Sequence, residues 1–560
     1  MSLAYLAIAF VGQSAAPTDS YEYTVRPGPN GALHVRLAFR GSASGKTVLE
    51  LPDGYGDAQE FYKGIQRLEV GEAKVESSPQ TPAQRVLVHA PKAQLVVEYD
   101  LVQSAPGDPD AAARYQFTYQ PTYLHSLGYA MWVHPKWTGT SKAQFTIRWE
   151  AFPTGWQIAN SHGEGKAVQS FRCPPDELLH GIYVGGDFRI HRLPSNGGTI
   201  IVATRGQWGF SDPDFATRIR KTIEATRKFW NDYSAPYYLV SILPLKTDPN
   251  SSTLGGTGLT NSFSLMGTTN MDIDSMTNIV SHDYFHNWNT PKLGTLPEPQ
   301  IEMYWFSEGF TDFFCRWIAL KEGNLSLSAY MHGWNDFAKS YYLSPKKNLN
   351  GAQVEKDFWE DYETQRQPYL RGYLLASIWN DEIVRRTNGA QNLGSVMLRL
   401  RDRNANGQAR LDVGAVDRLM KPLLGRSILP EIQSIIRDGK NIVLPQTFQL
   451  SVAKITRSPA NRYDLGFDFA ATKKDKKISG LDPNSNAYAA GLREGQVVVS
   501  RKPIWVGNPD KEVELMVEVG TEQKTIKFFP AKPTGEFYPQ LQWNESDKQK
   551  ILRRILGSKA

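Results

Sequence analysis

The sequence predicts a multidomain α+β protein with an N-terminal β-sandwich-like domain, a mostly α-helical middle domain and a small C-terminal β domain. Three observations support this fold class. Short runs of alternating apolar and polar residues fill the first third of the chain, a helical period dominates from residue 272 to about 440, and short strands return over residues 446–530. At roughly 150 residues per domain, 560 residues provide for three or four domains.

The N-terminal β domain is expected over residues 17–190. Runs such as YEYTVRP, ALHVRLAFR and QLVVEYDLV alternate apolar and polar residues between turns, which indicates half-buried strands. The preceding residues 1–16 (MSLAYLAIAFVGQSAA) are apolar and end in small residues, so they predict a secretory signal peptide; an apolar N-terminal strand is the alternative. A signal places the protein in the periplasm or outside the cell, and a cytoplasmic location is the alternative. No segment reaches 18 uninterrupted apolar residues, so no transmembrane segment is predicted.

The middle domain is expected over residues 191–440. Residues 213–233 have a helical period, and residues 237–244 are typical of a buried strand. Further helical patterns cover residues 307–322, 369–388 and 391–402. This succession predicts that helices carry most of the functional residues of the chain.

The charge balance argues against a nucleic-acid-binding protein. The chain has 63 Lys and Arg against 57 Asp and Glu, a net charge of +6. Its last sixteen residues, 545–560, hold five basic and two acidic side chains, so half of the net charge lies at the end of the expected basic tail (residues 533–560) rather than on a basic face. In that tail, four apolar residues are spaced for a short amphipathic helix: Ile551, Leu552, Ile555 and Leu556. The two cysteines, Cys173 and Cys315, lack a C-x-x-C partner, which excludes thiolate metal sites.

The run H-D-Y-F-H (282–286) is the strongest functional signal. Two histidines four residues apart on a helix project to the same side and reach one metal ion. A zinc hydrolase needs a third protein ligand, often a carboxylate, and Glu308 follows 22 residues after His286 at the start of a second predicted helix. Asp312, one turn further on, is placed to accept the free N–H of a ligating histidine. We therefore expect one zinc ion per chain, bound by His282, His286 and Glu308; a metal-free protein with incidental histidines is the alternative.

The run S-H-D-Y-F-H-N-W-N (281–289), followed by E-G-F-T-D-F-F (308–314), resembles the glycyl aminopeptidase family. Members of that family are gluzincin zinc metallopeptidases with an H-E-x-x-H helix, a downstream Glu ligand and a C-terminal PDZ domain. The resemblance implies a thermolysin-like catalytic domain over residues 191–440 and a peptide or peptide-like substrate. It continues through residues 368–376, where Tyr369 resembles the tyrosine that points at the metal-bound oxyanion in related gluzincins.

Two positions depart from the family pattern. Asp283 replaces the glutamate that activates the zinc-bound water, and its side chain is shorter by one C–C bond, about 1.5 Å. Residues 255–262 correspond to a G-G-L-E-H-like strand whose glutamate contacts the amino end of the substrate, and Thr260 occupies the position of that acid. We expect Gly258, Thr260 and Asn261 to line the substrate, with a plain strand-edge turn as the alternative.

The C-terminal domain, residues 446–532, resembles a PDZ domain. Residues 464–469 are similar to its carboxylate-binding loop and first strand, with Leu465, Gly466 and Phe467 in the loop, and residues 485–495 are similar to its short helix and turn. The resemblance implies that a peptide C-terminus binds there; a domain that only packs on the catalytic domain is the alternative. The charge run at residues 473–477 is expected to be a solvated loop.

The function predicted first is zinc-dependent hydrolysis of peptides, with Asp283 as the general base and Tyr369 as the donor to the oxyanion. The second hypothesis keeps the fold and the zinc. It is either a pseudoenzyme that works through the PDZ groove, or a metalloenzyme redirected to non-peptidase hydrolysis, hydration or elimination.

Overall fold

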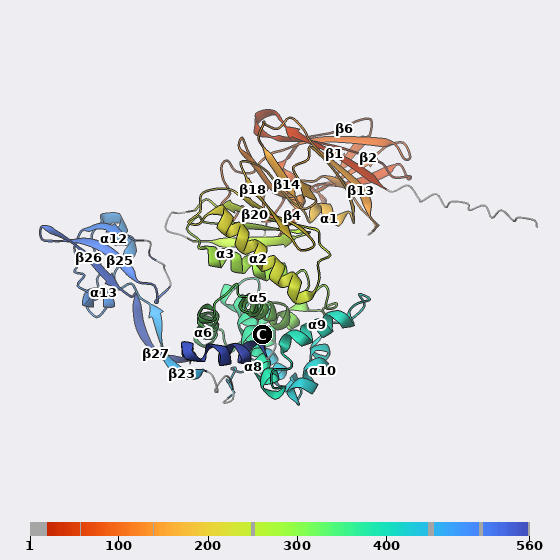
Figure 1. The fold of residues 1–560 in the computed structure, drawn as a ribbon. Helices are drawn as coiled ribbons and strands as arrows, with labels where there is room; N and C mark the ends of the chain where they lie inside the picture. The colour runs from red at the N-terminus through yellow and green to blue at the C-terminus, as the bar shows by residue number, and fades with distance from the viewer. Residues whose placement is uncertain are drawn as a thin grey trace, which may run out of the picture. The chain divides into compact units, whose positions relative to one another are not determined.

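The computed structural model describes residues 19–56, 58–137, 139, 141–247, 252–445, 448, 453–502, 504 and 508–557. The predicted signal peptide, residues 1–16, lies outside the described residues and stays a prediction. The chain divides into two compact units, Met1–Glu224 with Asp232–Asp283, and Ala225–Asn231 with Tyr284–Ala560 (Figure 1). None of the helices in the described part of the chain combines the length and the apolarity that a membrane crossing requires.

The first part of unit 1 is built from β-sheets. The largest is six-stranded, in the order β16-β13-β1-β2-β9-β6: Val168–Cys173, Ala143–Trp149, Ser20–Pro27, Leu33–Arg40, Gln94–Leu101 and Ile65–Val70. A four-stranded sheet has the order β12-β3-β8-β7: His134–Pro135, Lys46–Glu50, Gln84–Val88 and Lys74–Ser77. A five-stranded sheet has the order β10-β11-β17-β14-β15: Thr118–Gln120, Tyr123–Leu127, Ile182–Gly186, Gln157–Asn160 and Gly163–Glu164. The short strands β4 (Gly54–Tyr55) and β5 (Ala58–Gln59) pair with each other, and α1 spans Asp176–Leu179.

The strands with an alternating sequence pattern have one buried face and one exposed or half-buried face, as expected. In β1, Tyr21, Tyr23 and Val25 are buried while the residues between them are exposed or half-buried. Their side chains join a core cluster with those of Leu37 and Val97 from neighbouring strands. The half-buried strands that the sequence predicts are therefore present over this region.

A second five-stranded sheet completes unit 1, within the region expected to be mostly helical. Its order is β18-β19-β20-β22-β21: Arg189–Ser195, Gly198–Thr204, Tyr237–Pro244, Ser262–Gly267 and Leu254–Leu259. The three central strands are parallel, so a crossover must join β19 to β20, and helix α2 (Asp212–Trp230) provides it. Strand β21 is antiparallel and lies at the sheet edge. Helix α3 (Ile273–Phe285), which carries His282, follows β22.

Unit 2 consists mainly of helices grouped around α8 (Tyr362–Arg386). Helices α4 (Tyr304–Ser307), α5 (Gly309–Lys321) and α6 (Leu327–Leu343) pack against α8. Nearly all residues of α8 from Gln367 onward are buried, and the tryptophans Trp305, Trp317 and Trp379 are buried in the same unit. Further helices of this unit are η4 (Gln300–Met303), α7 (Gly351–Asp357), α9 (Leu393–Arg403), α10 (Val413–Leu424), α11 (Leu429–Glu431) and η5 (Ile432–Arg437). Helix α8 begins before the predicted start at residue 369, because the side chain of Asp361 caps it by accepting a 2.7 Å hydrogen bond from the Thr364 N–H.

The last part of the chain contains a long two-stranded ribbon and a small domain with its own core. The ribbon pairs β23 (Lys454–Tyr463) with β27 (Ala531–Gln542). The small domain has a three-stranded sheet, β24-β25-β26 (Val498–Arg501, Val513–Val519, Glu522–Phe528), with helices α12 (Phe469–Asp475) and α13 (Asn486–Ala489). Its buried cluster includes Leu465, Leu492 and Val517. A hydrophobic core of its own is what a separate C-terminal domain requires.

Two sequence predictions are wrong in this region. The strand expected within residues 464–469 does not form: β23 ends at Tyr463, residues 464–468 lie in neither a helix nor a strand, and α12 begins at Phe469, where Asp468 caps it by accepting a 3.0 Å hydrogen bond from the Ala471 N–H. Lys473 and Lys474 are exposed as expected, but they lie on α12 rather than in a loop.

Residues 533–560, the expected basic tail, contain most of β27 and then helix α14 (Lys548–Leu556). The amphipathic helix predicted here is confirmed. Its buried residues include Ile551 and Ile555, its Arg554 pairs with Asp381 of α8 at 2.5 Å, and the Ile555 carbonyl accepts a 3.0 Å hydrogen bond from the Trp317 indole.

Candidate metal centre

The helix that carries the two histidines is specified locally. The Asp272 carboxylate accepts hydrogen bonds from the Ser275 N–H and hydroxyl group, both at 2.8 Å, and so caps the start of α3 as the sequence predicts. Met276 and Val280 are fully buried and anchor one face of the helix. The four-residue spacing then directs the side chains of His282 and His286 to a common side, although α3 itself ends at Phe285.

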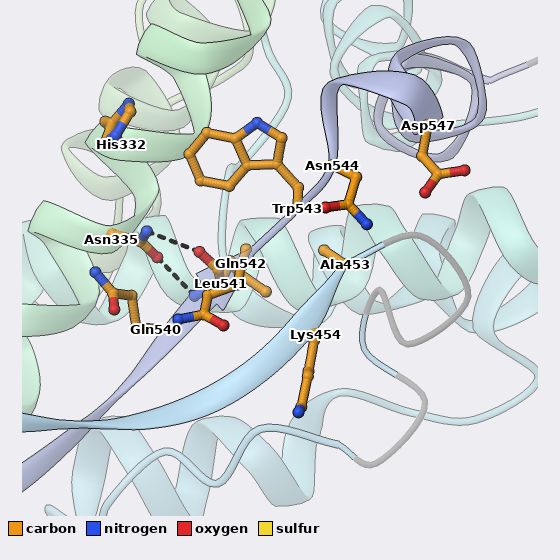
Figure 2. A pocket seen from close by; sticks show the side chains of 10 residues that line it. All are labelled: His332, Asn335, Ala453, Lys454, Gln540, Leu541, Gln542, Trp543, Asn544 and Asp547. Carbon is orange, nitrogen blue, oxygen red and sulfur yellow. Dashed lines mark hydrogen bonds between the residues drawn. The ribbon is translucent and has the colours of Figure 1, made fainter.

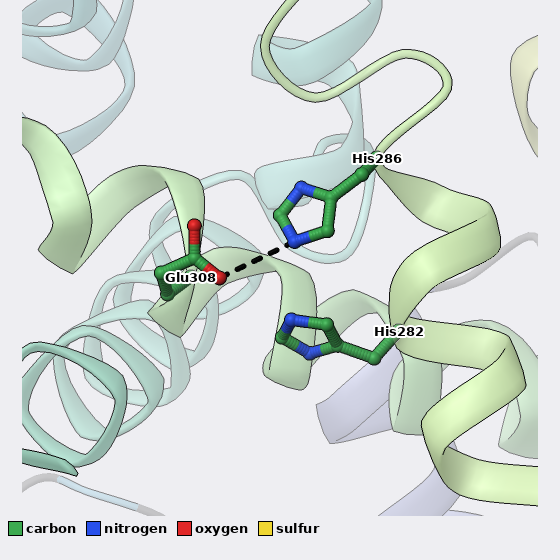
Figure 3. A group of neighbouring side chains, drawn as sticks. All are labelled: His282, His286 and Glu308. Atoms are coloured by element: carbon green, nitrogen blue, oxygen red, sulfur yellow. Dashed lines mark ion pairs between the residues drawn. The ribbon is translucent and has the colours of Figure 1, made fainter. Parts of the chain in front are cut away.

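The three predicted metal ligands come together (Figure 3). One ligand atom each from His282, His286 and Glu308 lies within 4.8 Å of the other two, and all three side chains are half-buried. His286 Nε2 is 3.2 Å from Glu308 Oε2. Ligand atoms about 2.0–2.1 Å from a tetrahedral zinc ion are about 3.3 Å apart, so this spacing and the two-imidazole, one-carboxylate donor set fit zinc.

A buried asparagine fixes the orientation of His286. The Asn289 carbonyl lies 2.7 Å from His286 Nδ1 and accepts its N–H, which leaves Nε2 as the lone-pair nitrogen that faces Glu308. The Asn289 amide donates to the Ser307 carbonyl and to the Thr311 hydroxyl group, both at 3.0 Å. Asn289 therefore joins the loop after α3 to the segment that bears Glu308.

Asn289 performs for His286 the task that the sequence analysis gave to Asp312. The N-W-N run after the second histidine marks the segment that contains Asn289. The sequence analysis missed its role because the acceptor is a backbone carbonyl, which every residue type has. Asp312 lies on α5, where its N–H donates to the Glu308 carbonyl at 3.0 Å. A role for the Asp312 carboxylate beside a ligating histidine stays a prediction.

The edge strand β21 lies beside Asp283. A Cβ atom built on Gly258 would lie 3.8 Å from Cβ of Asp283, so the missing side chain leaves this edge open next to the carboxylate. In the β21–β22 hairpin, Leu259 pairs with Ser262 across a two-residue turn, and Gly258 is the next position along. In an antiparallel ladder that position directs its N–H and C=O away from the partner strand. Gly258, which is exposed, thus offers backbone hydrogen bonds to an extended chain.

Thr260 and Asn261 form the turn of this hairpin. The Thr260 N–H donates to the His180 carbonyl at 2.8 Å, and the Asn261 carbonyl accepts from the Leu239 N–H at 2.9 Å. Asn261 has a positive φ of 49°, which asparagine tolerates better than most residues. These two backbone groups are already hydrogen-bonded within the protein, so contacts of Thr260 or Asn261 with a substrate would involve their side chains.

Tyr55 is a neighbour of Asp283 that the sequence analysis missed. Its hydroxyl group lies 2.5 Å from Thr257 Oγ1 on β21, and its ring stacks on that of Tyr129 at 5.1 Å. Burial raises the pKa of Tyr55, the hydrogen bond with Thr257 lowers it, and the charge of Asp283 raises it again. A neutral phenol therefore lies near the predicted base, and no local pattern around residue 55 indicates it.

Tyr369 lies one turn before a close helix crossing. A Cβ on Gly372 would lie 1.9 Å from the Trp305 carbonyl oxygen and 2.8 Å from the Gly309 Cα, so α8 touches the α4–α5 junction backbone to backbone. Glu308 immediately precedes Gly309 at that junction. Tyr369 is half-buried in a helix that is otherwise buried around it. The two glycines thus bring the turn of Tyr369 to the segment of Glu308.

The predicted PDZ carboxylate loop is already engaged within the small domain. Gly466 has a φ of 79°, and its N–H donates to the Asp464 carboxylate at 3.0 Å. Leu465 is buried in the core of the domain, and Phe467 packs against it. A carboxylate of the protein therefore occupies one of the N–H groups that would bind a peptide C-terminus.

A family-model match and a similar solved structure support a peptidase-like hydrolase, the enzyme class that the sequence predicts. Residues 275–371, which include both histidines, Glu308 and Tyr369, match the family model described as M61 glycyl aminopeptidase.

The structure is similar to that of an aminopeptidase N family protein from Idiomarina loihiensis, with a TM-score of 0.67 and 15% identity over 95% of this chain and 99% of that chain. An M1 zinc metallopeptidase from Deinococcus radiodurans gives a TM-score of 0.48 and 13% identity over 76% of this chain and 95% of that one. No curated protein matches the sequence. The similarity to the Idiomarina protein shows a multidomain fold like that of an aminopeptidase N family protein.

Proposed function

We propose that the protein is a zinc-dependent peptidase, similar to glycyl aminopeptidases, in which Asp283 is the general base. The observation that carries this proposal is the convergence of His282, His286 and Glu308 on one point, with the hydrogen bond from Nδ1 of His286 to the Asn289 carbonyl directing Nε2 toward Glu308. Zinc held by these three residues would polarise the scissile carbonyl and lower the pKa of a bound water.

Asp283 accepts the proton of the attacking water in this proposal. Its place next to His282 on α3 puts a carboxylate beside the metal ligands without making it a ligand. The substrate lies extended along β21, where the outward-facing backbone of Gly258 pairs with it. Because Gly258 lacks a side chain, the substrate can approach Asp283 closely enough to compensate for the shorter reach of aspartate.

Tyr369 donates a hydrogen bond from its hydroxyl group to the developing oxyanion. Such a donor acts mainly in the transition state, when negative charge accumulates on the carbonyl oxygen. The glycine crossing supports this assignment because it fixes the turn of Tyr369 relative to the segment that carries Glu308. The absence of an acid at residue 260 further predicts weak discrimination between free and acetylated substrate amino ends.

The test is an Asp283→Asn variant of the full chain, assayed for zinc content and for hydrolysis of peptides with an N-terminal glycine. Loss of a general base costs about 100-fold to 10,000-fold in kcat, while one equivalent of zinc should remain bound. Asp274→Asn is the matched control, since Asp274 lies on the same helix but is exposed and pairs with Arg218. Retention of full activity by Asp283→Asn would refute its role as the base.

The short base also favours a second candidate function. If the wild-type chain binds zinc but hydrolyses no peptide, free or acetylated, the protein is a zinc-binding pseudoenzyme or a metalloenzyme redirected to non-peptidase hydrolysis, hydration or elimination. In the pseudoenzyme form, the small C-terminal domain would be a PDZ-like module that binds peptide C-termini. Titration of the chain with labelled C-terminal peptides tests this form, and the contact of Asp464 with Gly466 predicts weak binding.

A further inference from the structure

Unit 2 has a groove of about 670 Å³ between α6 and the ribbon of β23 and β27 (Figure 2). Its buried polar side chain is that of Asn335, whose amide donates to the Leu541 carbonyl at 3.0 Å and whose side-chain oxygen accepts from the Leu541 N–H at 2.8 Å. Asn335 therefore holds β27 on α6 and is already satisfied within the protein. The edge of β21 in unit 1 differs, because a cation without an acidic partner lies against it.

Strand β21 is open at one end of its outer edge and covered at the other. Gly258 is exposed, and its N–H and C=O point away from β22. Because this alternation has a period of two, Gly256 also directs its N–H and C=O outward. Gly256 is half-buried, and its carbonyl accepts a 3.3 Å hydrogen bond from the Tyr115 hydroxyl group. An extended chain that pairs with Gly258 therefore meets Tyr115 two residues further along the edge.

Arg114, the neighbour of Tyr115 in sequence, covers the next position of the strand. A Cβ atom built on Gly255 would lie 2.6 Å from Nη1 of Arg114, so the guanidinium occupies the space that a side chain at residue 255 would need. Nε of Arg114 donates to the Ala111 carbonyl at 2.7 Å, and the guanidinium carbon lies 5.7 Å from the centre of the Tyr115 ring. These contacts hold the cation against the covered end of β21.

Arg114 forms no ion pair with any of the described acidic residues. The two acids of its own segment are engaged elsewhere: Asp108 pairs with Arg205 at 3.2 Å, and Asp110 accepts two backbone N–H groups, at 2.9 and 3.0 Å. In the described part of the chain, Nη1 and Nη2 of Arg114 have no hydrogen-bond partner, and the residue is half-buried. A guanidinium with open terminal donors is suited to a carboxylate, which it binds through two parallel N–H···O bonds.

We propose that Arg114 binds the C-terminal carboxylate of a short peptide substrate, an inference that rests on the proposed peptidase function. The peptide lies antiparallel to β21, with its carboxyl end toward Gly255, because that end carries the negative charge. A strand advances about 3.4 Å per residue, so Gly258 and Gly256 are about 7 Å apart along the edge. The residue paired with Gly258 is therefore followed by one further residue, and the carboxylate then reaches Arg114 where Tyr115 ends the open edge.

This contact would align a substrate whose amino end lacks an acidic partner at residue 260. Thr260 has no carboxylate to bind an α-ammonium group, and its N–H donates to the His180 carbonyl. Binding at the carboxyl end sets the register of the peptide instead. Because Gly258 faces Asp283, the peptide bond presented to the base is then fixed by its distance from the C-terminus. The substrate class is thus short peptides with a free carboxyl end.

The experiment measures peptide binding by isothermal titration calorimetry to the full-length Asp283→Asn variant loaded with zinc, in which slow turnover preserves the complex. The probes are Gly-Ala-Ala, its C-terminal amide, and the C-terminal amide of Gly-Ala-Asp. We expect the free acid to bind about tenfold more tightly than its amide, since hydrogen bonds to a charged group contribute on that order. Arg114→Gln in the same background should remove this difference, and Arg114→Lys should retain part of it.

The control variant is Arg85→Gln. Arg85 is half-buried on β8, and its Nη1 donates to the carbonyls of Pro82 and Gln84, at 2.8 and 2.7 Å. Its acid-to-amide ratio of Kd values should equal that of the parent. Equal or absent binding of Gly-Ala-Ala and its amide overturns the proposal, as does an unchanged ratio in Arg114→Gln. Binding of the Gly-Ala-Asp amide as tight as that of Gly-Ala-Ala also overturns it, because an acidic side chain would then be the ligand.

Hydrolysis by the wild-type chain separates this inference from the proposed function. If Gly-Ala-Ala and its amide are hydrolysed with equal kcat/KM, the carboxylate contact is wrong and the peptidase function stands. If the free acid binds more tightly but neither peptide is hydrolysed, the carboxylate contact stands and the peptidase function is refuted.

Discussion

Replacing Gly372 by alanine tests the helix crossing that positions Glu308 and Tyr369. The new Cβ would lie 1.9 Å from the Trp305 carbonyl oxygen, whereas ordinary contacts begin at 3.4 Å, so α8 must move by about 1.5 Å. The opposing atom belongs to the backbone and cannot rotate away. Overpacking of this kind costs about 1–3 kcal/mol, from which about 1 kcal/mol is regained because alanine favours a helix more than glycine does. We expect a net loss of about 1 kcal/mol, and at most about 2 kcal/mol, in the free energy of unfolding.

The same displacement should also affect function. A misplacement of about 1 Å near a reacting centre can lower kcat/KM about 100-fold, and here both the Glu308 segment and the turn of Tyr369 border the crossing. Urea unfolding and hydrolysis of a peptide with an N-terminal glycine measure the two effects. Gly414→Ala is the matched control, because a Cβ there meets only side-chain atoms, at 3.4 and 3.5 Å; it should be neutral or stabilising by up to about 1 kcal/mol. A Gly372→Ala variant with wild-type stability would refute the close crossing.

Three further predictions concern the metal, the oxyanion and acid stability. His286→Ala should reduce bound zinc from one equivalent to none. The control is His332→Ala, which removes an exposed histidine outside the cluster and should keep one equivalent. A full equivalent of zinc in His286→Ala would make the ligand assignment wrong. Tyr369→Phe should lower kcat about 100-fold to 1,000-fold with little change in KM, and a change in KM alone would instead assign it to substrate positioning. Burial lowers the pKa of both His125 and His162 to about 4, so between pH 6.5 and 4 the unfolded chain binds protons that the folded chain does not. Unfolding stability should therefore fall as the pH drops, by about 2 kcal/mol per histidine at pH 5, and equal urea stability at pH 7 and pH 5 would contradict this.

Local sequence patterns determined the elements and the candidate ligands. The alternation in β1 and the spacing of the histidines on α3 are periodic signals, and each reflects which face of one element is buried. Glu308 could be selected because the third ligand of a zinc hydrolase is often a carboxylate, and Glu308 lies near the start of a following helix. These predictions use residue types and short spacings, which the sequence contains in full.

Tertiary packing determined how those residues are supported. The acceptor for His286 is a backbone carbonyl, whose position depends on the path of the loop after α3 rather than on the identity of residue 289. Tyr55 reaches Thr257, which is 202 residues away in the chain, because two sheets of unit 1 bring them together. Long-range contacts of this kind leave no periodic pattern in the sequence.

One error of the sequence analysis has a local origin instead. The helix at residues 469–475 follows from the cap by Asp468, a local signal that the resemblance to a PDZ loop obscured. The amphipathic helix of the tail was visible in its spacing, but its docking on α8 through Arg554 and Asp381 was not. Sequence by itself determined which residues can act and on which elements they lie. Tertiary structure alone decided which of them meet, because burial of apolar surface fixes distances between elements that no local propensity specifies.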